Sequence, residues 1–233
     1  MAKIWVTKHN GSQQVYDQSK VINALKNSGI QDDRIPVILF EIEKTLYPGI
    51  ATNEIYKKLH QEIAQKVSQT DAQFFRAREG LAKVGSFVFE KLISEILTTQ
   101  GYNCTWNVMV PGFCIEHQTD VVATKGDQKL FVEVKHHRNE HRDTGLGDAV
   151  ETWGRIMDIR ESANPESKSF TGAVLVVNTK FSQHAIKFAA CRRVQLLGWR
   201  YCSLIGQEND LGLEKMLADL GKEKVVEMMK NIV

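Results

Sequence analysis

The chain has 233 residues, 42% hydrophobic and 25% charged, a composition typical of a globular protein rather than a disordered or fibrous one. Its formal net charge of +2 is too small to indicate nucleic-acid binding by itself, and it does not oppose such binding. No apolar run approaches the roughly 20 residues of a membrane span, and the N-terminus lacks the apolar core of a signal peptide. We therefore expect a cytoplasmic protein with no membrane partner. Its four cysteines lack C-x-x-C spacing, which favours free thiols over zinc.

Residues 1–82 have the pattern of a small hairpin followed by helices. Residues 3–8 alternate as in a strand, and Asn10-Gly11 predicts a turn before a second short strand at residues 13–16. Residues suited to helix N-caps precede three apolar helical stretches; they are Asp17, Asp32 or Asp33, and Thr52. Together these elements predict a compact unit at the small end of domain sizes.

A hydrophobic, basic and glycine pattern runs through the hairpin and into the first helix: Val6, Lys8, His9, Gly11 and Lys20. With the helices that follow, it resembles the ATP-cone, the regulatory nucleotide-binding domain at the N-terminus of ribonucleotide reductases. The resemblance covers residues 3 to about 80, with His9 where the family usually has Arg. It implies that these five residues bind ATP or dATP as a regulatory ligand.

Lys8, His9 and Lys20 could converge on a triphosphate, because a lysine ammonium is a compact point charge suited to phosphate. Each of these residues taken singly is more typical of a solvated surface, so the combination carries the hypothesis. The chain has no G-x-x-x-x-G-K-[ST] loop, and we therefore expect nucleotide binding without hydrolysis.

Residues 83–233 alternate between helical and strand patterns, which predicts an α/β domain. The expected order is a helix at 85–100, a strand at 102–110, a hairpin at 116–137, a loop at 138–147, a helix at 148–160, a strand at 171–177, a helix at 181–191, a strand at 199–204 and a C-terminal helix.

The hairpin at residues 116–137 carries the most informative charges. Gly126-Asp127 suits a two-residue turn with Gly in the left-handed first position. That turn places Asp120 opposite Glu133, and Gln118 opposite Lys135. Two adjacent carboxylates repel each other and raise one another's pKa unless a cation lies between them, and Mg²⁺ is the natural partner. The alternative is a half-exposed hairpin with ordinary charged residues on its wet face.

Asp120, followed by Glu133-Val134-Lys135 and preceded by a helix with Glu90, resembles the PD-(D/E)XK nuclease superfamily, and most closely the Mrr-like restriction endonucleases. The resemblance covers about residues 83–205 and implies a mixed sheet flanked by helices. It also implies that Asp120 and Glu133 hold Mg²⁺ with the Val134 carbonyl. Lys135 would position the attacking water, and Glu90 would complete the metal shell.

Histidines and arginines cluster around the same hairpin. His117 is expected to be a packed, hydrogen-bonded residue, since it lies three positions from Asp120. The loop that follows the hairpin could contact DNA phosphates or simply be solvated, and its histidines could instead bind a transition metal; it contains His136, His137, Arg138, His141 and Arg142.

The sequence thus predicts two domains, an ATP-cone at residues 1–82 and a nuclease domain at residues 83–233. The expected activity is Mg²⁺-dependent cleavage of DNA, controlled by an adenine nucleotide, in a chain that self-associates. Two alternatives remain: a nucleotide-sensing DNA-binding regulator with a catalytically silent nuclease fold, and an interaction protein in which the carboxylates are merely surface charges.

Overall fold

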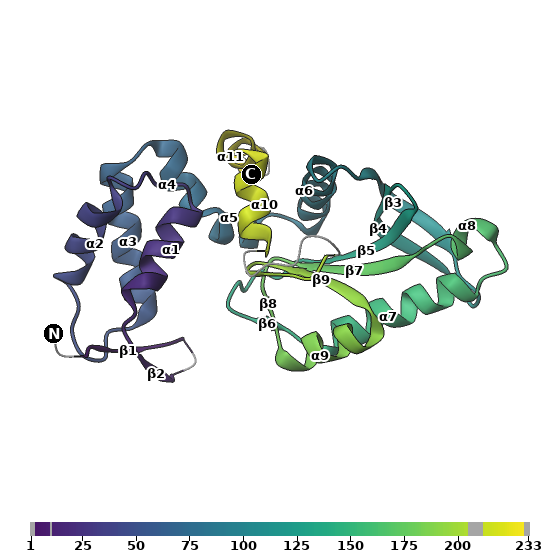
Figure 1. Cartoon of the computed structure of the whole chain (residues 1–233), viewed down its shortest axis with the longest axis horizontal. Helices are drawn as coiled ribbons and strands as arrows, with labels where there is room; N and C mark the ends of the chain where they lie inside the picture. Colours follow the sequence, from purple (N-terminus) through teal and green to yellow (C-terminus); the bar gives the residue numbers. More distant parts are fainter. Residues whose placement is uncertain (1–2, 10, 205–211, 231–233) are drawn as a thin grey trace. The chain divides into compact units, whose positions relative to one another are not determined.

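The computed structural model describes residues 3–9, 11–204 and 212–230. The chain forms two compact units, one comprising Met1–Ala77 and Gly221–Glu227, the other Arg78–Leu220 and Met228–Val233 (Figure 1). Among the described residues, no helix is both long enough and apolar enough to cross a membrane.

The first unit contains the expected hairpin and helices: β1 (Trp5–Thr7), β2 (Gln13–Val15), α1 (Gln18–Asn27), α2 (Ile35–Glu43), α3 (Thr52–Lys66) and α4 (Gln69–Phe75). The two strands are antiparallel, with Trp5 paired to Val15. Gly11 has a φ of 81°, as the predicted turn requires, whereas Asn10 lies outside the described residues. The core of this unit is aliphatic and includes the fully buried Leu25 and Ile38.

Helix capping in this unit follows the prediction only in part. Asp17 caps α1 by accepting a hydrogen bond from the Ser19 N–H at 3.0 Å. Asp32 and Asp33 do not cap α2, whose N-cap is Arg34, without a side-chain hydrogen bond. Thr52 is the first residue of α3 rather than its cap, because Ala51 has the extended backbone of the cap position.

A segment from the end of the chain also belongs to the first unit. α11 (Lys222–Lys230) begins in it, with Val225 fully buried. Lys222 donates to the Gly29 carbonyl at 2.8 Å and pairs with Asp71. The sequence predicted a C-terminal helix but gave no sign of this association.

The second unit is a six-stranded mixed sheet in the order β10-β9-β7-β5-β4-β3. β3, β4 and β5 are antiparallel, β5, β7 and β9 are parallel, and β10 is antiparallel to β9. The strands are β3 (Asn103–Pro111), β4 (Glu116–Lys125), β5 (Gln128–Lys135), β7 (Gly172–Val177), β9 (Val194–Gly198) and β10 (Tyr201–Cys202). The mixed α/β architecture predicted for this part of the chain is confirmed.

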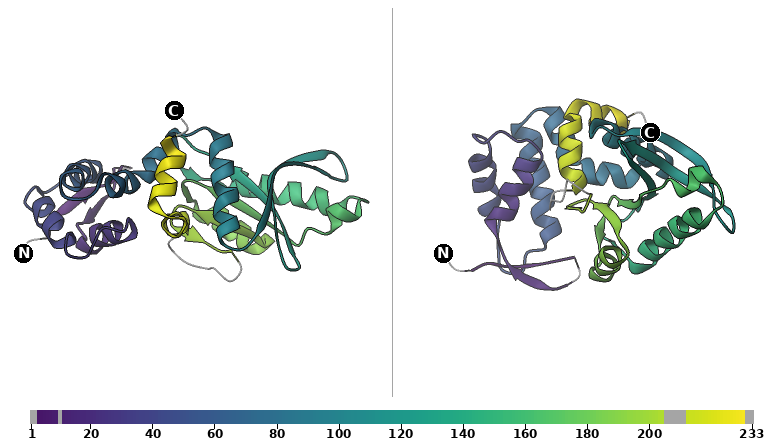
Figure 2. Two further views of the ribbon diagram at one scale, coloured as in Figure 1. Left: turned by 90° about the horizontal axis from the view of Figure 1, so that it is seen from above. Right: turned by 45° about the vertical axis from the view of Figure 1, so that its right-hand side comes forward.

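Helices cover both faces of this sheet. α6 (Ser86–Thr99) lies on one face, and α7 (Leu146–Glu161) and α9 (Gln183–Arg192) lie on the other (Figures 1 and 2). The remaining elements are α5 (Ala77–Lys83), α8 (Pro165–Lys168), α10 (Gly212–Leu220) and a small parallel pair, β6 (Asp143–Thr144) with β8 (Lys180–Phe181). Because the central strands are buried on both faces, their side chains are apolar almost throughout.

The last strands of the sheet differ from the prediction. The expected strand at 199–204 is only β10, two residues at the sheet edge. The main strand is β9, every residue of which is buried. The sequence prediction missed β9 because five residues directly after a helix give too short an apolar run to distinguish a strand from a helix end.

Candidate active site

The site lies where β4 and β5 separate. Their ladder runs from Lys125↔Gln128 to Val121↔Val132, in the register that the Gly126-Asp127 turn predicts, and Gly126 has the expected positive φ of 55°. Beyond Val121, β4 continues to pair with β3 as far as Pro111↔Glu116. The predicted pairing of Gln118 with Lys135 is therefore wrong, since the β4–β5 ladder ends at Val121↔Val132 and Gln118 is paired only in the β3 ladder, with Met109.

Asp120 occupies the point of separation. The described ladder stops one residue short of it, so Asp120 is not the direct strand partner of Glu133. Its Oδ2 instead accepts a hydrogen bond of 2.7 Å from the Val134 N–H. This bond brings the Asp120 carboxylate to the residue next to Glu133, and the two predicted acidic residues do come together.

Glu133 is buried, with only 3% of its surface exposed. Its Oε1 lies 2.9 Å from the Lys135 Nζ, and its Oε2 accepts from the Arg155 guanidinium. The alternative interpretation of the hairpin assumed that the face carrying Glu133 is exposed to solvent, and this face is buried. Phe131, two residues earlier on that face, is fully buried against Ile156 and Ile159 of α7, and a merely superficial role for the carboxylates is excluded.

Two residues of α7 complete the arrangement. Glu151 Oε1 lies 2.9 Å from the Lys135 Nζ, so the ion pairs run from Glu151 through Lys135 and Glu133 to Arg155. Arg155 also donates to the Gln118 carbonyl, and its guanidinium carbon lies 5.1 Å from the centre of the Phe131 ring.

Sequence reasoning missed both Glu151 and Arg155. They are four residues apart and therefore one turn apart on the same side of α7. The sequence does contain one indication of their role: opposite charges at this spacing next to the apolar Ile156 and Ile159. A charge that is partly buried needs a partner.

The three carboxylates have raised pKa values. Burial is the largest cause of the raised pKa of Asp120. The hydrogen bond from the Val134 N–H lowers this pKa, and the Glu90 charge raises it. Burial and then the Asp120 charge raise the pKa of Glu133. Burial also raises the pKa of Glu90, with a further contribution from the Glu133 charge. Glu90, which lies on α6, is thus electrostatically coupled to the other two.

Lys135 remains protonated at neutral pH. Burial acts to lower its pKa, but the hydrogen bonds to Glu151 and Glu133 outweigh burial and raise it. An ammonium fixed between two carboxylates can donate hydrogen bonds to a water or a phosphate and is not a base.

The chemistry of these donors fits a hard divalent cation. Asp120, Glu133 and Glu90 offer only oxygen ligands, which Mg²⁺ prefers, and their mutual repulsion would be relieved by a cation. Among the residues that the structure describes, however, no group of three or more His, Cys, Asp or Glu side chains is gathered closely enough to hold a metal ion. Glu133 is held instead by Arg155 and Lys135.

The histidines around the hairpin have structural partners. His117 is a packed residue as predicted, with its Nε2 2.7 Å from Asp158 Oδ2. His136 Nε2 contacts the Leu81 carbonyl at 2.7 Å, and His137 Nε2 lies 3.0 Å from Thr144 Oγ1. The transition-metal hypothesis for this loop finds no support in the described residues.

The loop after β5 is exposed at Arg138, His141 and Arg142. Its start is fixed by Asn178, whose side chain accepts from the His137 N–H and donates to the His137 carbonyl, each at 2.8 Å. Contact with DNA phosphates through this loop stays a prediction.

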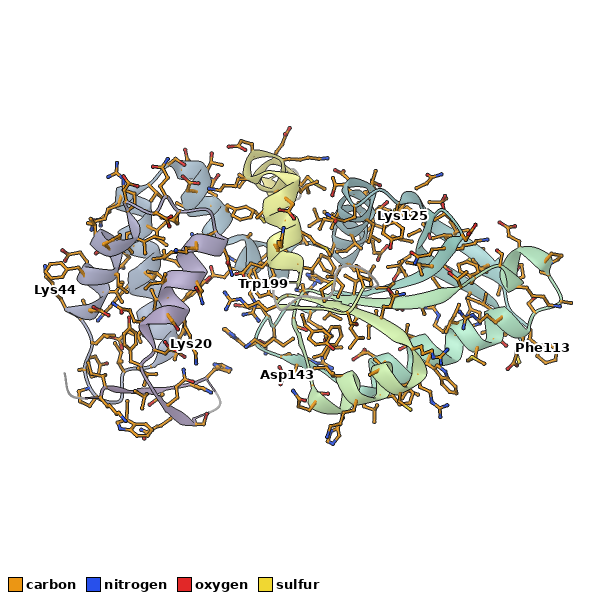
Figure 3. All side chains as sticks on the ribbon, in the orientation of Figure 1. Lys20, Lys44, Phe113, Lys125, Asp143 and Trp199 are labelled. Atoms are coloured by element: carbon orange, nitrogen blue, oxygen red, sulfur yellow. The ribbon has the colours of Figure 1, made fainter. Side chains whose placement is uncertain are left out.

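The residues predicted to bind nucleotide lie in and beside the N-terminal hairpin. Lys8, His9 and Gly11 belong to one turn, closed by a 2.9 Å hydrogen bond from the Gly11 N–H to the Lys8 carbonyl. Lys20, on α1 (Figure 3), donates to Gln14 Oε1 of β2 at 3.2 Å. Val6 is buried in the core of the unit and supports the hairpin from within.

Comparison with known proteins identifies the second unit. Residues 81–200 match the family model Mrr_cat, described as a restriction endonuclease. The chain belongs to this restriction endonuclease family. The match covers every element that builds the site, from α6 to β9, so the Mrr-like resemblance of the sequence is confirmed.

Two further similarities agree with the restriction endonuclease fold. An uncharacterized protein from Archaeoglobus fulgidus is 36% identical over 109 residues, which make up 47% of this chain and 59% of that protein. The crystal structure of AF1548, a protein of unknown function, has 31% identity and a TM-score of 0.51, over 59% of this chain and 67% of its own. The chain thus spans about three fifths of the length of the curated relative that it matches, and neither relative's name states an activity.

Proposed function

We propose that this chain is a Mg²⁺-dependent DNA endonuclease whose cleavage is controlled by ATP or dATP. The observation that carries the nuclease proposal is the meeting of Asp120, Glu133 and Lys135 where β4 and β5 separate, within a domain of the restriction endonuclease family. DNA is the substrate that this family membership suggests.

In the proposed reaction, Asp120, Glu133 and Glu90 would hold the ion, together with the Val134 carbonyl. When bound, Mg²⁺ polarises the scissile phosphate and lowers the pKa of a water. Lys135 donates hydrogen bonds that orient the attacking water and stabilise the charge developing on the phosphate. Its partial burial strengthens that interaction, because solvent screens it less.

Plasmid nicking with Mg²⁺ tests this activity. We expect Asp120→Ala and Lys135→Ala each to reduce the nicking rate about 100-fold or more, as loss of a charged group at a reacting phosphate commonly does. Matched controls are Asp127→Ala in the exposed hairpin turn and Lys129→Ala on the same strand as Lys135. The Nζ of Lys129 lies 3.6 Å from Glu166 Oε1, away from the proposed site residues. Equal nicking by all four variants would refute the nuclease assignment.

Nucleotide control is proposed from the basic turn of the N-terminal unit. Lys8 and His9 are exposed in this turn, and Lys20 is exposed on the adjoining helix. The ATP-cone resemblance supports adenine nucleotide as the ligand, and both it and the restriction endonuclease family favour a homo-oligomer. We propose the cytoplasm as its location.

A second candidate function is a nucleotide-sensing DNA-binding regulator whose nuclease fold is silent. It is favoured by the ion pairs of Glu133, whose two oxygens are both held by side-chain cations. The regulator would bind DNA without cleaving it, so binding unaccompanied by nicking across Mg²⁺, Mn²⁺ and different DNA forms would select this function.

A further inference from the structure

Arg155 donates to one oxygen of Glu133, a carboxylate of the proposed metal site. The Glu133 carboxylate has two oxygens, of which Oε1 faces Lys135 and Oε2 accepts from Arg155. Lys135 is required by the proposed mechanism, whereas Arg155 has no step in it. Both cations compensate the Glu133 charge in this structure, and Arg155 is the one that the mechanism leaves without a role.

The guanidinium is held by more than this one ion pair. It donates to the Gln118 carbonyl of β4 while bound to Glu133 of β5, and it lies over the Phe131 ring. Arg155 therefore bridges the two strands at the position where they separate. Its side chain is 19% exposed, so water screens its charge only partly.

A divalent cation and Arg155 compete for the Glu133 carboxylate. Mg²⁺ binds oxygen at roughly 2.0–2.1 Å and requires near-octahedral geometry, so its coordination shell would fill the space where the guanidinium now donates. The two cations would also repel each other across a partly buried site. The Gln118 carbonyl and the Phe131 ring give the displaced guanidinium partners on the strands beside Glu133.

We propose that Arg155 is a displaceable internal counter-ion, which binds Glu133 in the metal-free protein and leaves it when a divalent cation enters. This inference rests on the metal site of the proposed function. The divalent cation binds more weakly than the carboxylates alone would allow, because it must first break the Glu133–Arg155 pair.

The test measures binding of Mn²⁺ to the full chain by calorimetry, without DNA. Arg155→Met should bind Mn²⁺ about ten-fold more tightly than the wild type, a factor of the size expected from removing one charge-assisted hydrogen bond. Arg155→Lys keeps the charge and should stay close to the wild type. The control is Arg192→Met on α9, which removes a guanidinium stacked 4.7 Å from the centre of the Trp153 ring, and it should change nothing.

Unchanged or weaker Mn²⁺ binding by a folded Arg155→Met protein would overturn the inference. A second measurement covers the case in which that variant fails to fold. In wild-type protein, Mg²⁺ titration should shift the side-chain Nε–H NMR signal of Arg155 and leave that of Arg192 in place. An Arg155 signal that stays fixed while Asp120 and Glu133 signals move would equally overturn it.

Failure of the nuclease proposal remains distinguishable. Tighter Mn²⁺ binding by Arg155→Met, with no DNA cleavage by any variant, would leave the counter-ion role intact and remove the nuclease. DNA cleavage by the wild type, together with unchanged metal affinity in Arg155→Met, would support the nuclease and refute the counter-ion role.

Discussion

Asp158 of α7 fixes the turn between β3 and β4 from outside the sheet. Its Oδ1 accepts from the Cys114 N–H at 2.8 Å, its Oδ2 lies 2.7 Å from His117 Nε2, and its carbonyl accepts from the Phe113 N–H at 2.8 Å. The hydrogen bond from Cys114, and then that from His117, lower the pKa of Asp158 to about 2. One carboxylate thereby positions the strand that carries Asp120.

We expect Asp158→Asn to lower the melting temperature at pH 7. A carboxylate with a depressed folded-state pKa stabilises the fold above its unfolded pKa of about 3.9, and this stabilisation is lost as the pH falls through the folded value. The melting temperatures of wild type and Asp158→Asn should therefore converge between about pH 4 and pH 2. A constant difference over that range would show that ionisation of Asp158 does not contribute.

The contribution of Asp120 to the stability of the fold changes with pH in the opposite direction. Its pKa is raised by burial and by Glu90, so its share of the stability is present at low pH and is lost as the pH rises through the folded value. In divalent-free buffer at pH 8, Asp120→Asn should melt at a higher temperature than the wild type, and the gap should narrow toward pH 4. Asp127→Asn, in the exposed turn, is the control. A lower melting temperature for Asp120→Asn at pH 8 would contradict this assignment.

Single residues also show what the sequence could reveal of the site. Asp120, Glu133 and Lys135 were predictable because one glycine turn sets the register of the whole ladder. The separation of β4 from β5 at Asp120 was not predictable, because the alternating pattern of β4 continues past Val121. Neither was the positive φ of 54° at Asn107 of β3, a backbone conformation that the residue type permits without requiring. Arg155 and Glu151 reach the site only through the packing of α7.

At the scale of elements, β9 is the strand that the sequence pattern concealed. It lies parallel to β7, with Leu197 paired to Val176, and β10 pairs with its other edge at Cys202. Strand identity here depends on pairing with β7, which α9 separates from β9 in the sequence, and local periodicity does not report such pairing. The helices with long apolar stripes, such as α6, were by contrast predicted within a residue or two.

Leu197→Ala should reveal how much β9 contributes. Leu197 is fully buried, so its truncation removes apolar contacts and leaves a cavity, at a cost of about 2–5 kcal/mol in the free energy of unfolding. Urea unfolding followed by tryptophan fluorescence measures this, because Trp106, Trp153 and Trp199 all lie in the second unit. Val150→Ala, at a side chain 40% exposed, should cost less than about 0.5 kcal/mol. Similar losses in the two variants would argue against a structural role for β9.

At the scale of the whole chain, the proposed coupling joins a nucleotide site in one unit to DNA cleavage in the other. A ligand that binds only the folded protein stabilises it by mass action, by about 2.7 kcal/mol at 100 times its Kd. We expect ATP or dATP to raise the melting temperature of the wild type and of Lys57→Ala, an exposed control on α3, but not that of Lys8→Ala. A shift preserved in Lys8→Ala would place the nucleotide elsewhere.

The return of the chain end to the first unit bears on how the protein is made. Ribosomes release the N-terminal residues first, and domains generally fold in that order during synthesis. Here Lys222, which binds Gly29 and Asp71, and buried Val225 emerge only after residues 78–220 of the second unit have been translated. Residues 81–200, which match the restriction endonuclease family, can therefore fold while the first unit still lacks its segment Gly221–Glu227.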